Sequence, residues 1–250
     1  FLEWIKLKVG SEHFIHMKCY FMKHLAGKKF KGPLELYKYI SEQKGINNLV
    51  KAARGYLNYC EATDKLSAET IDKYRKILKL KRTKIDYHVP DDKEIVKNYN
   101  LIKGNKNLEL VYLVLACSGL RYIEVLRFLK NYDKTKFVDH GTFVSYNISE
   151  IRGSKSVNNL YLPRFVYDKL NHVDNTYNSL RQRFKEKGCT FTLKYLRKWN
   201  YNFLIYNGVP ESVADFIQGR SSNSVSANHY LAKSQQANHW YGMITQKLIL

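Results

Sequence analysis

The stretch Lys194-Tyr195-Leu196-Arg197 places two basic side chains three residues apart, and Gln218-Gly219-Arg220 and His229-Tyr230 follow it. Residues three apart lie on one face of a helix, so Lys194 and Arg197 are expected to point the same way. Lysine and arginine can together neutralise a phosphodiester, and a tyrosine hydroxyl can attack its phosphorus. The pattern therefore indicates chemistry on a DNA backbone.

The composition favours a polyanionic partner. The chain has 250 residues, of which 44% are hydrophobic, enough to bury one large core or two modest ones. Its 42 Lys and Arg against 22 Asp and Glu give a net charge of +20, and such surfaces bind phosphate backbones by releasing counterions. A basic ribosomal or membrane-surface protein would share this charge. The longest apolar run, Leu110–Cys117, is far shorter than the roughly 20 residues that span a bilayer.

The cysteines and histidines give no sign of a disulfide framework or a metal site. Four cysteines are scattered without a Cys-x-x-Cys pair, which is typical of buried thiols in a reducing compartment: Cys19, Cys60, Cys117 and Cys189. His13, His16 and Cys19 recur every three residues, but the third lies off the face of the first two. The sequence also lacks a phosphate-binding P-loop. We therefore expect neither a metal nor another cofactor.

Residues 1–80 are expected to form a compact helical unit that binds DNA. Apolar residues recur at helical spacing in four segments, and Ser11, Pro33 and Ser67 mark the starts of the first, second and fourth. The first helix is predicted to run to Ala26. The loop that follows it is basic, and we expect its lysines to contact DNA: Lys28, Lys29 and Lys31.

Residues 81–90 are expected to link this unit to a second domain. Between Lys79 and Pro90 the helical pattern breaks and basic side chains crowd together: Lys79, Lys81, Arg82 and Lys84. An extended basic segment can follow a phosphate backbone. The charges taken alone fit a solvated end of the fourth helix equally well.

Residues 91–250 are predicted to form a larger domain. Helices are expected over residues 91–102, 107–117, 120–129, 164–171 and 176–187, from Thr192, from Pro210 and over 235–250. The apolar period changes to two in residues 137–138, 142–148 and 160–162. A turn over 153–156 would make the last two a hairpin, with Lys155 at its tip. The expected fold class is therefore mostly α with one small antiparallel β-sheet (α+β).

Phosphoryl transfer to a tyrosine makes three demands on a site. The nonbridging oxygens of the phosphate gain negative charge in the transition state and favour fixed cations. Arginine suits them best, because its planar guanidinium stays charged and can donate to two oxygens at once. The leaving 5′-oxygen needs a proton from a general acid. The tyrosine has a reference pKa of about 10, so it needs a base or strongly positive surroundings.

Several segments meet these demands in an order that resembles the tyrosine recombinase family. Gly119-Leu120-Arg121-Tyr122-Ile123-Glu124 resembles the family's first box, usually Thr-Gly-Leu-Arg with an acidic residue three positions on. Lys194-x-x-Arg197 resembles the second box, and Gly219-Arg220 resembles the pair that follows it. Lys155 stands in the place of the family's hairpin lysine, and Tyr230 in the place of its nucleophile.

The chain departs from the common pattern in informative ways. Most members have His where Lys194 stands, and His or Trp where Arg220 stands. The gap before Tyr230 is one residue longer than in the bacterial Xer type, whose spacing would select His229. This version looks like the SSV-type integrases of archaeal viruses and plasmids, and the resemblance covers roughly residues 117–230.

The resemblance implies that the arginines bind the scissile phosphate. Arg121 and Arg197 would clamp it, and Arg220 would add a third donor. Glu124, one turn from Arg121, would brace the arginines without touching DNA. Plainer explanations exist for each residue alone: Arg121 and Glu124 could be a surface ion pair, and Arg220 could cap a helix C-terminus.

The resemblance also implies roles for two lysines and for Tyr230. Lys155 would protonate the 5′-oxygen, and Lys194 would orient the phosphate or help with the tyrosine proton. Lys155 could equally be an ordinary exposed turn residue. Tyr230 is one of 20 tyrosines, and the nearest competitor, Tyr241, falls on the apolar face of the last predicted helix. The joint occurrence of these positions favours the catalytic interpretation.

A family member would be a site-specific DNA recombinase, or integrase, that inserts or excises a mobile element through a 3′-phosphotyrosyl link, without ATP or metal. Its two domains would close as a C-shaped clamp on double-stranded attachment sites. It would be a monomer or dimer when free and a homotetramer on two duplexes, in the host cytoplasm near the nucleoid. A type IB topoisomerase and a non-catalytic basic DNA-binding protein remain as alternatives.

Overall fold

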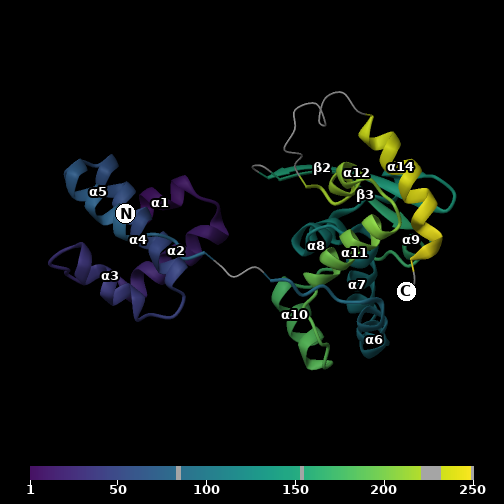
Figure 1. Ribbon diagram of the computed structural model, residues 1–250, viewed down its shortest axis with the longest axis horizontal. Coiled ribbons are helices and arrows are strands. Elements are labelled where there is room, and N and C mark those ends of the chain that lie inside the picture. The colour runs from purple at the N-terminus through teal and green to yellow at the C-terminus, as the bar shows by residue number, and fades with distance from the viewer. Residues whose placement is uncertain (83–85, 153–154, 221–231, 249–250) are drawn as a thin grey trace. The chain divides into compact units, whose positions relative to one another are not determined.

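A computed structural model of the chain describes residues 1–82, 86–152, 155–220 and 232–248 (Figure 1). The chain divides into two compact units, Phe1–Asp86 and Tyr87–Leu250. Each unit has a hydrophobic core of its own. The division falls within the segment that the sequence marks as a linker.

Residues 1–82 form five helices, α1 (Leu2–Lys8), α2 (Ser11–His24), α3 (Pro33–Ser41), α4 (Ile46–Ala62) and α5 (Ala68–Ile77). Pro33 and Ser67 start their helices as predicted, and the Ser67 hydroxyl accepts from the Thr70 amide at 3.3 Å. The expected count of four was wrong because α1 has no capping side chain to announce it. Ser11 is the first helical residue and not the cap, and α2 ends two residues before Ala26.

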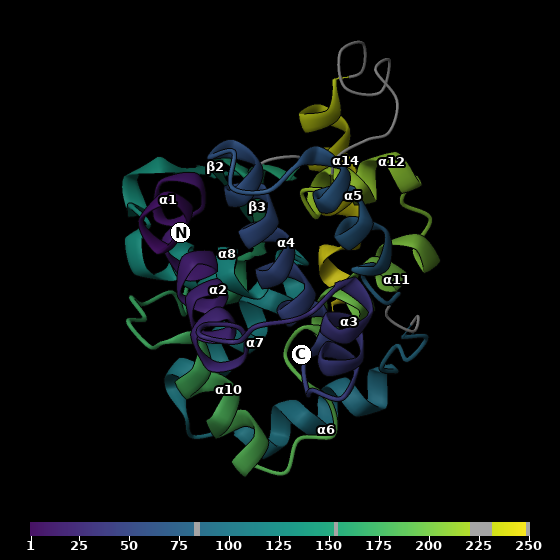
Figure 2. The same ribbon diagram turned by 90° about the vertical axis from the view of Figure 1, so that its left-hand side faces the viewer.

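The core of this unit lies between α4 and its neighbours. Helices α2 and α4 pack along each other, and α3 and α5 both contact α4 (Figures 1 and 2). The buried residues come from α3, α4 and the α5 segment: Leu36, Ile40, Leu49, Val50, Ala53, Leu57, Ile71 and Leu78. A small apolar centre therefore holds these helices together.

The second unit is mostly helical with one small sheet, which confirms the predicted fold class. Its helices are α6 (Asp92–Ile102), α7 (Lys106–Ser118), α8 (Tyr122–Asn131), α9 (Arg164–Tyr167), α10 (Tyr177–Glu186), α11 (Tyr195–Tyr206), α12 (Glu211–Ile217) and α14 (Lys233–Ile244), with 3-10 turns η1 at Lys134–Lys136 and η2 at Thr245–Lys247. The strands β1 (Phe137–Asp139), β2 (Phe143–Arg152) and β3 (Lys155–Pro163) form one antiparallel sheet in the order β1-β2-β3.

The second and third strands form the expected hairpin. Their pairing runs from Phe143 opposite Pro163 to Arg152 opposite Lys155, with an irregularity between Asn147 and Glu150. Lys155 begins β3 opposite Arg152, so the turn predicted over residues 153–156, with Lys155 at its tip, was wrong for Lys155 and Ser156. Residues 153–154 lie outside the described chain. The Lys155 side chain also lies outside what the structure describes.

Helix α7 is the centre of the second unit. Every residue from Leu110 to Ser118 is buried, and α7 packs against α11, β3, α8 and α9. The longest apolar run of the sequence is therefore a core helix. Among the described residues, no helix has the length and apolarity needed to cross a membrane.

Several predicted helix boundaries differ from the structure, and the last helix, expected over residues 235–250, spans Lys233–Ile244. Gly119 takes a left-handed conformation, φ +62°, that ends α7, so α8 begins only at Tyr122. The Thr192 backbone oxygen accepts from the Tyr195 amide, and Lys194 is the N-cap of α11 in place of Thr192, so the helix begins two residues later than expected. Helix α9 stops at Tyr167 because the chain then turns to bury Leu170 and to bond the Val173 amide to Leu129.

The thiols are not all buried, contrary to the expectation from the sequence. Cys60 and Cys117 lie in the cores of the two units. Cys19 is exposed because it falls on the solvent face of α2, and Cys189 is half-buried. Among the residues that the structure describes, no three His, Cys, Asp or Glu side chains gather where they could hold a metal ion.

Candidate active site

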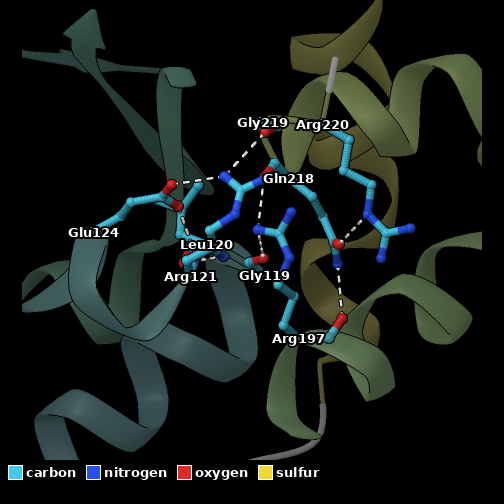
Figure 3. Close-up of polar contacts among 9 residues, drawn as sticks. Gly119, Leu120, Arg121, Glu124, Arg197, Gln218, Gly219 and Arg220 are labelled. Atoms are coloured by element: carbon cyan, nitrogen blue, oxygen red, sulfur yellow. Dashed lines mark hydrogen bonds and ion pairs between the residues drawn. The ribbon is translucent and has the colours of Figure 1, made fainter. Parts of the chain in front are cut away.

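Three arginines from three different elements converge in the second unit (Figure 3). Arg121 is the N-cap of α8, Arg197 lies in the first turn of α11, and Arg220 follows α12. Backbone carbonyls join them: Arg197 Nη1 donates to Gly119 O at 2.8 Å and to Gln218 O at 2.7 Å. Arg121 Nη1 donates to Gly219 O at 3.3 Å. The three segments singled out in the sequence are thus one cluster.

Glu124 holds Arg121 from inside the protein. Its Oε1 accepts from Arg121 Nη1 at 2.7 Å, and its Oε2 accepts from the Arg121 backbone amide at 2.8 Å. The Glu124 side chain is 10% exposed and the Arg121 side chain 25%, so this is not a solvated surface pair. The carboxylate therefore fixes both the helix start and the direction of the guanidinium.

Arg197 is the most constrained of the three cations. Burial, together with the charges of Arg121 and Arg220, lowers the pKa of Arg197 to about 9, and Glu124 and Asp215 act in the opposite direction. Carbonyl oxygens hold its guanidinium in place without neutralising it. The site consequently carries positive charge that an anion would compensate.

Arg220 is oriented by an aromatic ring and an amide. Its guanidinium carbon lies 3.9 Å from the centre of the Tyr201 ring, and its Nε donates to Gln218 Oε1 at 3.2 Å. Asp215 is farther away, with Oδ1 at 3.8 Å from Nε. The backbone amide of Arg220 does bond to Asp215 O at the end of α12, but the side chain is directed by Tyr201 and Gln218.

Lys194 has a different setting from Arg197. It is the N-cap residue of α11 and is exposed, whereas Arg197 is half-buried. Its Nζ lies 4.9 Å from the ring centre of the adjacent Tyr195. Lys194 is thus an exposed residue beside an aromatic ring, three positions before Arg197.

Of the two tyrosines considered as nucleophiles, the structure describes one. Tyr230 and the neighbouring His229 lie outside the described residues. Tyr241 is fully buried, and its hydroxyl donates to Cys117 O at 3.1 Å and Tyr161 O at 3.2 Å. Burial raises the pKa of Tyr241 well above its usual value. Tyr241 is therefore a core residue that ties α14 to α7 and β3.

Two buried amides were missed by the sequence analysis. Gln218 and Asn200 are 0% and 1% exposed, and Gln218 Nε2 donates to Asn200 Oδ1 at 2.8 Å. Asn200 Nδ2 in turn donates to Ala116 O at 2.8 Å and Cys117 O at 3.2 Å. The sequence did contain a signal for Asn200, because it is a polar residue between Trp199 and Leu204 on the buried side of α11, where a polar side chain needs a partner.

The basic residues predicted to bind DNA outside this site lie on the surface of the first unit. Six of the seven are exposed: Lys28, Lys29, Lys31, Lys79, Lys81 and Arg82. Lys28 Nζ lies 4.3 Å from the ring centre of Tyr39. Asn47 fixes the backbone of Lys81 through two hydrogen bonds, of 2.8 and 2.9 Å. The seventh, Lys84, lies outside the described residues.

The second unit matches one protein family almost throughout. The family model for archaeal phage integrases matches residues 87–247. No protein of curated function matches the chain in sequence.

Solved structures of recombinases share the fold at low sequence identity. A lambda integrase tetramer bound to a Holliday junction is 12% identical with a TM-score of 0.66, covering 90% of this chain and 76% of that one. A lambda integrase dimer bound to a COC′ core site is 12% identical with a TM-score of 0.64, covering 89% and 93%. The XerH recombinase in a pre-cleavage complex with difH is 15% identical with a TM-score of 0.53, covering 89% and 75%.

Proposed function

Because this chain belongs to the archaeal phage integrase family, we propose that it recombines DNA with Tyr230 as its nucleophile and the three arginines as its phosphate site. The chain is a site-specific recombinase of the tyrosine class. The convergence of Arg121, Arg197 and Arg220 carries the assignment of the site. Three guanidinium groups with one ion-paired glutamate suit a phosphate whose charge grows in the transition state.

The proposed reaction conserves bonds. Tyr230 Oη attacks the phosphorus as it loses its proton, and the bond from phosphorus to the 5′-oxygen breaks. A 3′-phosphotyrosyl link and a free 5′-hydroxyl result. The 5′-hydroxyl of the partner strand then attacks the same phosphorus, and the tyrosine leaves. One phosphodiester is exchanged for another, so the step needs no ATP.

The remaining side chains have supporting roles in this proposal. Lys155, at the start of β3, would give its proton to the leaving 5′-oxygen. Lys194, the N-cap residue of α11, would orient the phosphate or help with the tyrosine proton. Glu124 would keep Arg121 aimed at the phosphate through the contacts described above.

The proposed partner is double-stranded DNA carrying an attachment site. The net charge of +20 and the exposed lysines of the first unit support it. We assign residues 1–80 to DNA binding and residues 81–90 to a basic linker. Lambda integrase binds a Holliday junction as a tetramer, which supports four copies of this chain on two duplexes. The copies would assemble on DNA and separate into monomers or dimers without it.

A nicked suicide substrate tests the function. The nick lets the short 5′ fragment diffuse away after cleavage, so the covalent complex accumulates and survives denaturation. In EDTA, wild type is expected to form this adduct, Tyr230→Phe to form none and Tyr241→Phe to retain it. Absence of the wild-type adduct would refute the enzyme, and an adduct with Tyr230→Phe would refute the nucleophile.

A second duplex with a matching overhang tests the reaction type. Transfer of the bound strand into this duplex is expected of a recombinase. Relaxation of a supercoiled plasmid without transfer would indicate a type IB topoisomerase instead. DNA binding without either product would indicate a non-catalytic protein.

A further inference from the structure

We propose that Gln218 is a positioning residue that fixes Arg220 relative to Arg197, and that Asn200 anchors Gln218 in place. The proposal rests on the proposed function, since it names two residues that would shape the phosphate site. Neither residue belongs to the charged set by which the site is recognised. Their side chains are uncharged, fully buried and directly bonded to each other.

Gln218 uses both ends of its amide within the site. Its Nε2 donates to Arg197 O at 3.0 Å and to Asn200 Oδ1 at 2.8 Å, while its Oε1 accepts from Arg220 Nε at 3.2 Å. Its backbone oxygen also accepts from Arg197 Nη1 at 2.7 Å. A single residue thus contacts the backbone of one arginine and the side chains of two.

Asn200 connects this amide to the end of α7. Its Nδ2 donates to the carbonyls of Ala116 and Cys117, in the last turn of α7 before Gly119. Gly119 lies so close that a Cβ there would overlap with Asn200 Oδ1 and lie 2.6 Å from Gln218 Nε2. The amide pair therefore sets the spacing between all three arginine-bearing segments.

The chemistry of the site requires an amide at position 218. A glutamate would direct a carboxylate oxygen at two acceptors, Arg197 O and Asn200 Oδ1, and a methionine would supply neither a donor nor a strong acceptor. The Tyr201 ring restrains the plane of the Arg220 guanidinium but still allows it to rotate within that plane. The bond from Nε to Gln218 restrains that rotation and turns the two terminal nitrogens away from Gln218.

A double-mutant cycle tests this role. Gln218→Met keeps the length of the side chain and removes its hydrogen bonds, and Arg220→Ala removes the group that it positions. Each variant and the double variant are assayed for the single-turnover rate of adduct formation on the suicide substrate. Gln218→Met is expected to slow cleavage by about 100-fold in the wild-type background, as expected for a misplaced phosphate ligand. In the Arg220→Ala background it is expected to slow cleavage by less than about 3-fold.

Asn98→Leu is the matched control for loss of a buried amide. Asn98 is 0% exposed and bonds to Thr190 through Nδ2 at 3.2 Å and Oδ1 at 3.1 Å, apart from the arginines. The Asn98→Leu variant is expected to lower the thermal midpoint by about as much as Gln218→Met does. Its cleavage rate is expected to stay within about 3-fold of the wild-type rate. Affinity for an uncleaved duplex should stay within about 3-fold for both variants, because Gln218 is buried and makes no contact with DNA itself.

The outcomes separate the possible failures. Equal slowing by Gln218→Met with and without Arg220, or slowing no greater than that of Asn98→Leu, would overturn the positioning role. Failure of wild type to form the adduct would overturn the proposed function instead. If Gln218→Met does not fold, Asn200→Ser completes the same cycle, because it removes the anchor and leaves Gln218 present.

Discussion

Replacing Gly119 by alanine is the sharpest test of how the arginine cluster is built. Gly119 has φ +62°, a conformation that costs alanine about 1–2 kcal/mol. The added Cβ would also overlap with Asn200 Oδ1 and approach Gln218 Nε2 to 2.6 Å. The amide pair must then separate, and each buried group that loses its partner costs about 1–3 kcal/mol.

These contributions predict a loss of at least about 3 kcal/mol in the free energy of unfolding of the second unit. For a unit of this size that corresponds to a fall of about 10 °C in the thermal midpoint. Cleavage should fall by at least about 10-fold as well, because Gly119 O is a hydrogen-bond acceptor for Arg197 and moves with the turn.

Gly188→Ala provides the control because Gly188 has φ +75° but nothing within 4 Å of an added Cβ. It should cost only the conformational part, about 1–2 kcal/mol, and leave cleavage unchanged. Thermal unfolding of both variants followed by circular dichroism, with suicide-substrate kinetics, measures the difference. Equal midpoints for the two variants would refute the close packing of Gly119 against the amides.

Two further predictions follow from the surroundings of the site. Tyr241→Phe removes a buried hydroxyl that donates to Cys117 O and Tyr161 O. The free energy of unfolding, measured in urea, should fall by about 1–2 kcal/mol, and the cleavage rate should be retained. A fall in cleavage rate above about 10-fold would contradict a purely structural role. Sulfate should raise the thermal midpoint more in wild type than in Arg197→Gln, since a dianion relieves the repulsion that lowers the pKa of Arg197 to about 9. An equal response of both proteins at pH 7 would contradict an anion site.

Helix starts with a local signal could be predicted from the sequence. Pro33, Ser67 and Thr176 announce their helices by fixed backbone angle or by a capping oxygen, and the structure has these helices where expected. Thr192 carries the same kind of signal and misled the prediction. Its neighbours Phe191 and Leu193 are buried, so core packing decides where that helix begins.

The charged members of the site could be identified from their spacing, but the residues that arrange them could not. Arg121, Arg197 and Arg220 belong to recognisable boxes, whereas Gln218 and Asn200 have no charge and no motif of their own. Asn200 Nδ2 donates to Ala116 O and Cys117 O, more than eighty positions earlier in the chain. These contacts form only because α11 packs on α7, and the residue pattern of the sequence does not show which helices pack together.

The arrangement of acceptors explains how three like charges can share one site. Carboxylates would hold the guanidinium groups firmly but would also cancel the charge that a phosphate needs. Here backbone oxygens of Gly119 and Gln218 hold Arg197, and Gly219 O adds to the contacts of Arg121. An amide and an aromatic ring orient Arg220. Among the described residues, a carboxylate makes a close ion pair with Arg121 alone. Carbonyls fix direction at little cost in charge, so the cluster stays positive and rigid before DNA arrives. That preorganisation is what a transition state with growing negative charge requires.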